Sequence, residues 1–258
     1  MQPAGDRAVP TVPADGRTRL PRAVPPSVWA LPDGHDADAE GLVGLGADLA
    51  PATLVDAYRR GIFPWPHPGV PLPWFCPDPR GVLTLDTVHV SRSLRRTLRR
   101  SGWTSTVDVA TEAVLTACAE RGEEGTWITE GMRAAYLQLS RLGWVHSVEV
   151  WAGTELVGGV YGVQIGGVFT GESMFHRNSD ASKVALVELV ARFTGAGGAL
   201  VDVQLQTPHL ASLGVVELPR SAFLHLLATH RDRLVRMPVH AQPVSRLAER
   251  LRSTLVDG

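Results

Sequence analysis

The stretch between residues 146 and 205 constrains the fold more than any other part of the chain. Its apolar residues first follow the spacing of strands, over His146–Trp151, Glu155–Gln164 and Val168–His176. Short turns containing Gly153 and the pair Gly166-Gly167 separate the three segments. Strands joined by connections this short pair antiparallel, so we predict a three-stranded antiparallel unit.

The pattern then changes to that of a helix, which Asp180 can cap and Gly197-Gly198 can end. The apolar stripe of this helix is Leu186, Leu189, Val190 and Phe193. A strand over Ala199–Leu205, a short helix near Thr207–Leu213 and a strand near Val215–Pro219 complete the series. Antiparallel strands followed by alternating helices and strands predict an α+β class, with a mixed, mostly antiparallel sheet flanked by helices.

The N-terminal part has a different character. Residues 1–27 are rich in Pro, Ala, Gly and Arg without a period, which predicts a disordered tail. A short helix is expected after Asp48, with Pro51 at its first position and Tyr58 on its apolar face. Phe63 to Arg80 is dense in Pro and Trp, which excludes a long helix or a central strand and predicts an irregular packed segment.

The apolar pattern weakens after about residue 237. Residues 237–258 form a C-terminal extension, in which the spacing of Leu247, Leu251 and Leu255 indicates a helix.

Further helices are predicted over residues 91–100, 108–121 and 129–143. In the first, Ser91 is the cap, and Leu94 and Leu98 face inward. Arginines recur on another face of this helix and form a basic stripe: Arg92, Arg95, Arg96 and Arg99. Such a stripe is either a solvated surface or a contact for RNA phosphates, which orients nucleic acid without reading its sequence.

Composition limits the class of protein. The net charge of −1 argues against a protein that coats nucleic acid, although a local basic patch remains compatible with it. No apolar run approaches the roughly 18 residues of a membrane span and no secretory signal is visible, so we expect a cytoplasmic protein without membrane contact. Cys76 and Cys118 have no metal-type spacing, so we expect free thiols and no metal.

Two segments carry polar side chains where a core is expected. Asp202 and Gln204 alternate with valines on a strand, so both point to one face, and burying them without partners is costly. They either bond a neighbouring loop or form part of a site. Glu172 lies among Val, Phe, Thr, Gly and Met, and is either an edge-strand glutamate or a negative pocket for a cationic ligand.

Large aromatic side chains give a third set of candidates. Trp127 lies in a turn before a helix, Trp65 in the Pro-rich segment and Tyr58 in the helix before it. Aromatic residues of this size most often belong to the core. They can also offer a flat surface on which an unpaired base stacks.

Nine motifs in order resemble the bacterial leucyl/phenylalanyl-tRNA–protein transferases, over about residues 40–226. They are Gly61-Ile62-Phe63-Pro64-Trp65, Cys76-Pro77-Asp78-Pro79-Arg80, His89-Val90-Ser91-Arg92-Ser93, Gly125-Thr126-Trp127-Ile128-Thr129, His146-Ser147-Val148-Glu149-Val150-Trp151, Gly158-Gly159-Val160-Tyr161-Gly162, Gly171-Glu172-Ser173-Met174-Phe175, Ala181-Ser182-Lys183 and Asp202-Val203-Gln204. No single motif decides, but nine with matching spacing are specific.

The resemblance implies a small N-terminal α/β domain over residues 28–80 and a GNAT-like acyltransferase domain over residues 81–236. It also implies transfer of Leu, Phe and, less readily, Met from aminoacyl-tRNA to proteins that begin with Arg or Lys, which marks them for degradation. On this resemblance, the catalytic residues are Asp202 and Gln204, Glu172 binds the acceptor, and the aminoacyl-adenosine site is Tyr58, Trp65, Trp127, Tyr136 and Met174. The amino-acid side-chain pocket is Val160, Phe169, Leu186, Leu189 and Phe193. We expect a monomer without a cofactor.

The chain departs from the common pattern of the family at several positions. Val203 replaces a frequent Cys, Asp180 a usual Asn, and Val160 a frequent Met or Leu. The N-terminal tail is also longer than typical. These changes leave the polar candidates in place but make the shape of the side-chain pocket harder to infer.

The expected mechanism follows from an ester that is already activated, so ATP is not required. Placement of the amine against the ester carbonyl can supply roughly 7–11 kcal/mol. We expect Gln204 to bond the amine and Asp202 to accept charge through it. Two alternatives remain. A CoA-dependent acetyltransferase would need a Gly-rich loop at a helix start, and residues 176–183 contain no glycine. A non-catalytic RNA-binding or peptide-binding protein on the same scaffold would not need the polar candidates.

Overall fold

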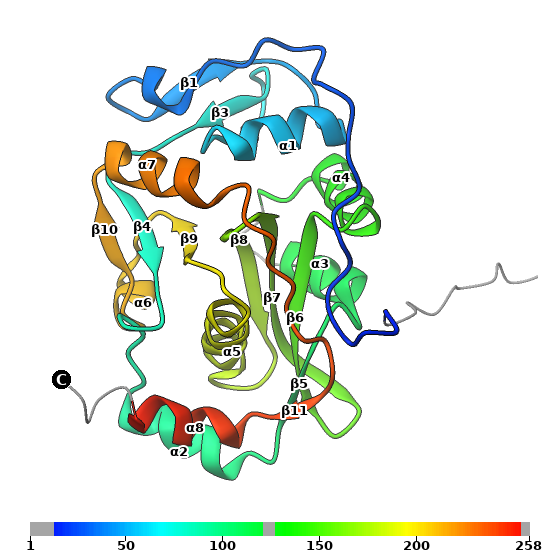
Figure 1. The fold of residues 1–258 in the computed structure, drawn as a ribbon, viewed down its shortest axis with the longest axis vertical. Helices are drawn as coiled ribbons and strands as arrows, with labels where there is room; N and C mark the ends of the chain where they lie inside the picture. Colours follow the sequence, from blue (N-terminus) through cyan, green and yellow to red (C-terminus); the bar gives the residue numbers. More distant parts are fainter. Residues whose placement is uncertain (1–12, 121–126, 254–258) are drawn as a thin grey trace, which may run out of the picture.

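The computed structural model describes residues 13–120 and 127–253 of the 258-residue chain. Two sheets and the helices around them make up this part (Figure 1). The strands are β1 Leu42–Leu45, β2 Phe63–Pro64, β3 Pro73–Phe75, β4 Arg80–Leu83, β5 Thr104–Val107, β6 Val145–Ala152, β7 Glu155–Ile165, β8 Val168–His176, β9 Leu200–Gln204, β10 Val216–Leu218 and β11 Gln242–Pro243. The helices are the 3-10 helix η1 Gly34–Asp36, α1 Pro51–Arg59, α2 Arg92–Arg100, α3 Thr111–Ala119, α4 Glu130–Arg141, α5 Ala181–Gly195, α6 Pro208–Ala211, α7 Arg220–His230 and α8 Ser245–Ser253.

The larger sheet has eight strands in the order β10-β4-β9-β8-β7-β6-β5-β11. β6, β7 and β8 form the predicted antiparallel unit, and the tight turns at Gly153 and Gly166 connect them with φ near +60°. Among the described strands, β8 and β9 are the only parallel pair, and α5 joins them as a crossover. The predicted α+β class and the mixed, mostly antiparallel sheet are therefore confirmed.

Helices cover both faces of this sheet, and each face has its own apolar cluster. α5 packs on one face with Leu186, Leu189 and Phe193 buried in the first cluster. α1, α3 and α4 pack on the other face, where Tyr58 and Tyr136 are buried in the second cluster. None of the helices in the described residues is both long and apolar enough to cross a membrane.

The small sheet has the order β1-β3-β2, and it lies with α1 at one end of the molecule (Figure 1). The expectation that the segment from Phe63 to Arg80 contains no central strand was wrong, because β3 is the middle strand of this sheet. Pro73 is tolerated there as the first residue of a three-residue strand. Trp74 Nε1 donates to the carbonyl of Gly46 at 2.7 Å and ties the strand to the loop after β1.

Several elements differ from the sequence-based expectation. β4, β5 and α7 had no prediction of their own because they are short or weakly periodic. The helix expected over residues 108–121 is shorter, as α3, and residue 121 lies outside the described residues. Asp180 precedes α5 but does not cap it. Its φ is +69°, and its carboxylate accepts from Lys183 Nζ at 2.9 Å and Thr97 Oγ1 at 3.0 Å.

Residues 13–27 form an ordered strap along the main body, so the prediction of disorder was wrong for them; residues 1–12 lie outside the described residues. Thr18 is buried, its amide donates to Met237 O at 2.8 Å, and Val239 N donates to Gly16 O at 2.9 Å. Composition could not reveal this, because these partners of the strap, and others such as Trp144, lie more than 100 residues away in the chain.

The C-terminal segment is held by a buried ion pair on α5. Arg192 Nε donates to Glu188 Oε1 at 2.5 Å, and its other nitrogens donate to the carbonyls of Pro238, His240 and Ser105 at 2.6–3.1 Å. This arginine therefore connects α5 to β5 and to the chain that leads into α8. The predicted helix is present as α8, although Leu255 lies outside the described residues.

Candidate active site

Polar side chains gather where β8 and β9 part. The two strands pair only over residues 168–170 and 200–202. β8 then continues beside β7 as far as His176, while β9 stays paired with β4 on its other side. The residues just beyond the parallel pairing are Glu172 on β8 and Gln204 on β9, so both lie at the edge of the split.

Both strands carry a β-bulge at this level. On β8, Gly171 and Ser173 lie opposite consecutive residues of β7, so Glu172 is an extra residue. On β9, Val203 is extra against β4, and Gln204 follows with φ +63°. A positive φ at a residue other than glycine is uncommon and costs conformational free energy. Bulges re-aim side chains and are frequent beside active sites.

The Glu172 carboxylate is the centre of a buried network. Tyr58 Oη donates to its Oε1 at 2.8 Å and Tyr136 Oη donates to its Oε2 at 3.1 Å, while the two hydroxyls lie 2.6 Å apart. Gln204 Nε2 donates to Oε1 at 3.0 Å. Four elements, α1, α4, β8 and β9, thus place four of the predicted site residues within hydrogen-bonding distance.

Burial dominates the electrostatics of this network. Desolvation raises the pKa of Glu172 to about 7, with a smaller contribution from the Asp202 carboxylate, although the bonds from the tyrosines and the charge of Arg80 lower it. Desolvation and the nearby Glu172 also hold the pKa of Tyr58 and of Tyr136 well above 10. Both phenols stay protonated, and the carboxylate titrates near neutral pH.

Asp202 lies beside this network but is fully engaged. Arg80 Nε and Nη2 donate to its two oxygens at 2.7 Å each, Thr170 Oγ1 donates at 3.0 Å, and the amide of Gln204 donates at 2.9 Å. The bidentate contact is the strongest geometry for an arginine and a carboxylate. The bond to the Gln204 amide stabilises the strained backbone that aims the Gln204 side chain.

Arg80 is as buried as its partner, with side-chain exposures of 1% and 0%. Its guanidinium lies between the rings of Phe63 and Phe223, at 5.0 and 4.5 Å from their centroids. Burial alone lowers the pKa of Arg80, but the Asp202 charge outweighs it and leaves that pKa raised. Sequence reasoning did not assign Arg80 or Thr170 a role, because only the fold brings their strands next to β9.

The other residues predicted for the aminoacyl-adenosine site, Trp65, Trp127 and Met174, are half-buried. Trp65 is half-buried on the small sheet, with its ring 5.9 Å from that of Phe75. Trp127 is half-buried against the cluster that contains the two tyrosines, and Gly125 and Thr126 of its motif lie outside the described residues. Met174 is half-buried on β8 and packs against the α5 cluster.

The residues expected to line the amino-acid pocket lie together beneath the site. Val160, Phe169, Leu186, Leu189 and Phe193 all belong to the cluster under α5, with exposures of 0–3%. The rings of Phe169 and Phe193 meet edge to face at 5.8 Å. Their role as a pocket stays a prediction.

The arginine stripe lies elsewhere. Arg92, Arg96 and Arg99 are exposed and Arg95 is half-buried on α2. α2 and α8 lie at the end of the molecule opposite α1 and α7 (Figure 1). The stripe therefore does not touch the polar network, and a ligand that contacts both must be long.

Comparison with known proteins identifies the family of this chain. A family model for leucyl/phenylalanyl-tRNA protein transferase matches residues 82–228, and the model for the N-terminal domain of that family matches residues 47–78. The enzyme of that name from Chromohalobacter salexigens is 53% identical over 204 residues, which cover 78% of each chain. Those from Shigella dysenteriae serotype 1 and Escherichia coli O7:K1 are 49% identical over 207 residues, or 80% of this chain and 88% of theirs.

The chain belongs to the leucyl/phenylalanyl-tRNA–protein transferase family. It is an aminoacyltransferase whose substrates are aminoacyl-tRNA and protein. The ends of the two matched regions fall on either side of residues 79–81, close to the start of β4 in the larger sheet. The whole strap and the chain after residue 228 lie outside both regions.

Proposed function

We propose that this transferase moves Leu or Phe, and less readily Met, from tRNA to the α-amine of proteins that begin with Arg or Lys, and so creates a degradation signal. The observation that carries this proposal is the buried Glu172 carboxylate at the split between β8 and β9. A carboxylate in such a place attracts a cationic side chain, and a charged hydrogen bond contributes about 1.5–3 kcal/mol. We place the reaction in the cytoplasm and in a single copy of the chain.

The donor is held by its adenosine end and its amino-acid side chain. In this proposal Trp65 or Trp127 stacks on the terminal adenine, and Tyr58, Tyr136 and Met174 complete the surface around the ester. The cluster under α5, which includes Phe169 and Phe193, receives the side chain of the transferred amino acid. An apolar pocket separates two side chains that differ by one methylene by only about 1–3 kcal/mol. We therefore expect slower transfer of Met beside Leu and Phe.

The chemical step forms a C–N bond between the acceptor amine and the ester carbonyl and breaks the bond from that carbon to the ribose oxygen. The amine must lose a proton, and the leaving ribose oxygen must gain one. Gln204 is placed to contact the amine and orient it. Asp202 has no free oxygen directed at a substrate, since Arg80, Thr170 and the Gln204 amide occupy it. We therefore assign Asp202 a positioning role that acts through Gln204.

The tRNA body is proposed to contact the α2 stripe through phosphates. Arg92, Arg95, Arg96 and Arg99 present their charges at the far end of the molecule from the network. A tRNA is long enough to bridge the two regions, whereas a small acyl donor is not. This separation favours aminoacyl-tRNA over acetyl-CoA as the donor.

The test is transfer of labelled Leu from Leu-tRNA to a peptide with N-terminal Arg, without ATP. The same peptide with N-terminal Ala and a reaction with acetyl-CoA are run alongside. Label on the Arg peptide alone supports the proposal. Equal labelling of the Ala peptide would contradict the role of Glu172 in selecting an N-terminal Arg. Acetylation of a peptide by acetyl-CoA would show that the chain is a different class of acyltransferase.

A further inference from the structure

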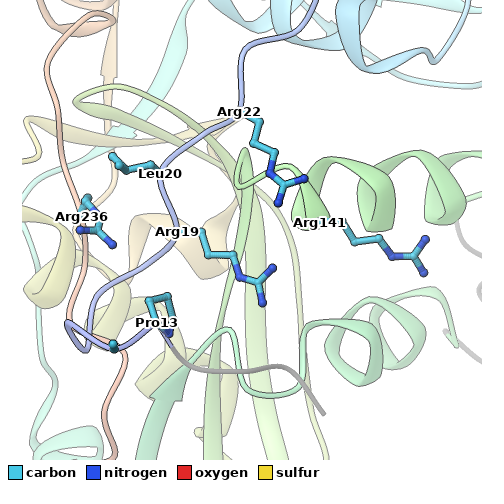
Figure 2. Close-up of a pocket in the computed structure, with 7 residues that line it drawn as sticks. Pro13, Arg19, Leu20, Arg22, Arg141 and Arg236 are labelled. Carbon is cyan, nitrogen blue, oxygen red and sulfur yellow. The ribbon is translucent and has the colours of Figure 1, made fainter. Parts of the chain in front are cut away.

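We propose that an arginine-lined hollow beneath the strap binds backbone phosphates of the donor tRNA, at a place separate from the α2 stripe. The hollow has a volume of about 530 Å³, and its lining includes Arg19, Arg22, Arg141 and Arg236. Figure 2 shows Arg19 and Arg22 extending from the strap toward the end of α4, where Arg141 lies. This inference rests on the proposed function, because that function supplies the tRNA.

The charged side chains that line the hollow are all arginines. No carboxylate is among its described lining residues, although Asp15 of the strap pairs with Arg236. In the part of the chain that the structure describes, the guanidinium groups of Arg22 and Arg141 have no hydrogen-bond or ion-pair partner. Clustered arginines repel one another unless an anion neutralises them, and the planar guanidinium fork matches the oxygens of a phosphate.

The hollow is built rather than accidental. Arg22 N donates to Leu142 O at 2.8 Å, and Trp144 Nε1 donates to Arg22 O at 2.8 Å, so the backbone of Arg22 is held on both sides. Arg236 Nε donates to Thr18 O at 2.8 Å, and its guanidinium pairs with Asp15. These contacts fix where the strap crosses the molecule and thereby fix the starting points of the charged side chains.

Close packing at Gly143 confirms how tightly the strap lies on the chain after α4. A Cβ at this position would be 2.8 Å from the carbonyl oxygen of Leu20, and the φ of Gly143 is +81°. Only glycine allows the strap to pass this close. The arginines of the strap are therefore presented at one depth next to the end of α4.

The position of the hollow suits an RNA that enters the site. Arg141 is the last residue of α4, the helix that carries Tyr136 to the Glu172 network. The two residues are five positions apart, so their side chains leave the helix on different sides: Tyr136 is buried toward the network and Arg141 is exposed. A tRNA whose aminoacylated end reaches the network would pass over this outer side with the phosphates of the preceding nucleotides. A volume of this size admits a stretch of backbone rather than a single ion.

Most of the arginines of the hollow lie outside the regions that match the family models. Arg19, Arg22 and Arg236 lie outside the two regions that match the family models, and only Arg141 lies inside them. The strap therefore adds positive charge that the matched regions alone do not supply. The same chemistry would also hold free phosphate, so the test must separate the two sources.

The experiment compares binding of uncharged tRNA by the wild type and by Arg22→Gln/Arg141→Gln over a range of salt concentrations. Loss of two phosphate contacts should raise Kd roughly tenfold near 50 mM salt and reduce the slope of log K against log salt by about 1.5. The control, Arg59→Gln/Arg60→Gln, removes the same charge from the end of α1. Wild-type Kd and slope in the test variant, or an equal change in the control, would overturn the inference.

Two further arms keep the result distinct from the proposed function. Inorganic phosphate is titrated into both proteins, and saturation that depends on Arg22 and Arg141 without any change in tRNA binding would assign the hollow to a small anion instead. Transfer of Leu to an Arg peptide is then measured. We expect the test variant to keep its rate at saturating tRNA and to show a raised KM for tRNA. If the wild type does not transfer Leu to the Arg peptide, the proposed function is contradicted, but the tRNA affinities of the wild type and the variants can still be compared.

Discussion

Removing Arg80 tests whether the Asp202 carboxylate is held by a desolvated ion pair. Arg80→Met keeps a long side chain between Phe63 and Phe223 but leaves the carboxylate buried without its cation. Breaking a buried pair by deleting one partner costs about 3–5 kcal/mol. The side-chain exposures of 1% and 0% place this pair at the buried extreme, where solvent screens least.

Urea unfolding followed by circular dichroism measures the effect. With an m value of about 2 kcal/mol per molar, a loss of about 4 kcal/mol lowers the midpoint by about 2 M. The matched control is Arg133→Met, since Arg133 also makes a bidentate contact, with Glu130 on the surface of α4. An exposed pair of this kind contributes about 0–1 kcal/mol. An equal shift in both variants would refute the reasoning.

The double variant Arg80→Met/Asp202→Leu separates stability from activity. Because it removes both charges, its free energy of unfolding should lie closer to the wild-type value than that of either single variant. Transfer should remain lost, since the Gln204 amide no longer has the Asp202 oxygen that holds its strained backbone. A double variant that is stable and transfers at the wild-type rate would show that Asp202 does not position Gln204.

Further predictions concern pH, packing and the C-terminal segment. The pKa of Glu172 is about 7 in the folded chain and 4.5 in the unfolded chain. The neutral side chain therefore contributes about 3 kcal/mol to stability below pH 4.5, and this contribution is lost as pH rises through 7. Glu172→Gln should make the free energy of unfolding depend less on pH in this range. The KM of an Arg peptide should rise about tenfold per unit below pH 7, whereas a fall in kcat alone would point to a base. Gly214→Ala places a Cβ 1.8 Å from Thr87 O and should cost at least about 2 kcal/mol in thermal unfolding. Arg192→Met leaves Glu188 its pair with Arg246 but removes the donors to the carbonyls of Pro238, His240 and Ser105, so it should cost at least about 1–3 kcal/mol, and an unchanged Tm would contradict its role.

Local pattern determined the main elements and the candidate residues. The strand spacing over β6, β7 and β8 and the apolar stripe of α5 predict a layered α+β sheet, since each period of apolar residues can be buried in only one way. Glu172 and Gln204 stood out because polar side chains are costly in apolar strands. The ordered motifs, rather than any single residue, indicated the family.

The tertiary structure decided what these residues contact. The ion pair of Asp202 depends on Arg80, which lies 122 positions earlier and reaches β9 only through the pairing of β4. The bulges that aim Glu172 and Gln204 arise from register between strands, which no local pattern records. The strap likewise looked disordered by composition and is ordered by partners more than 100 residues away, among them Leu142 and Met237. The positions of Asp202, Glu172, Gln204 and the strap therefore depend on contacts between segments far apart in the chain, and not on local propensity.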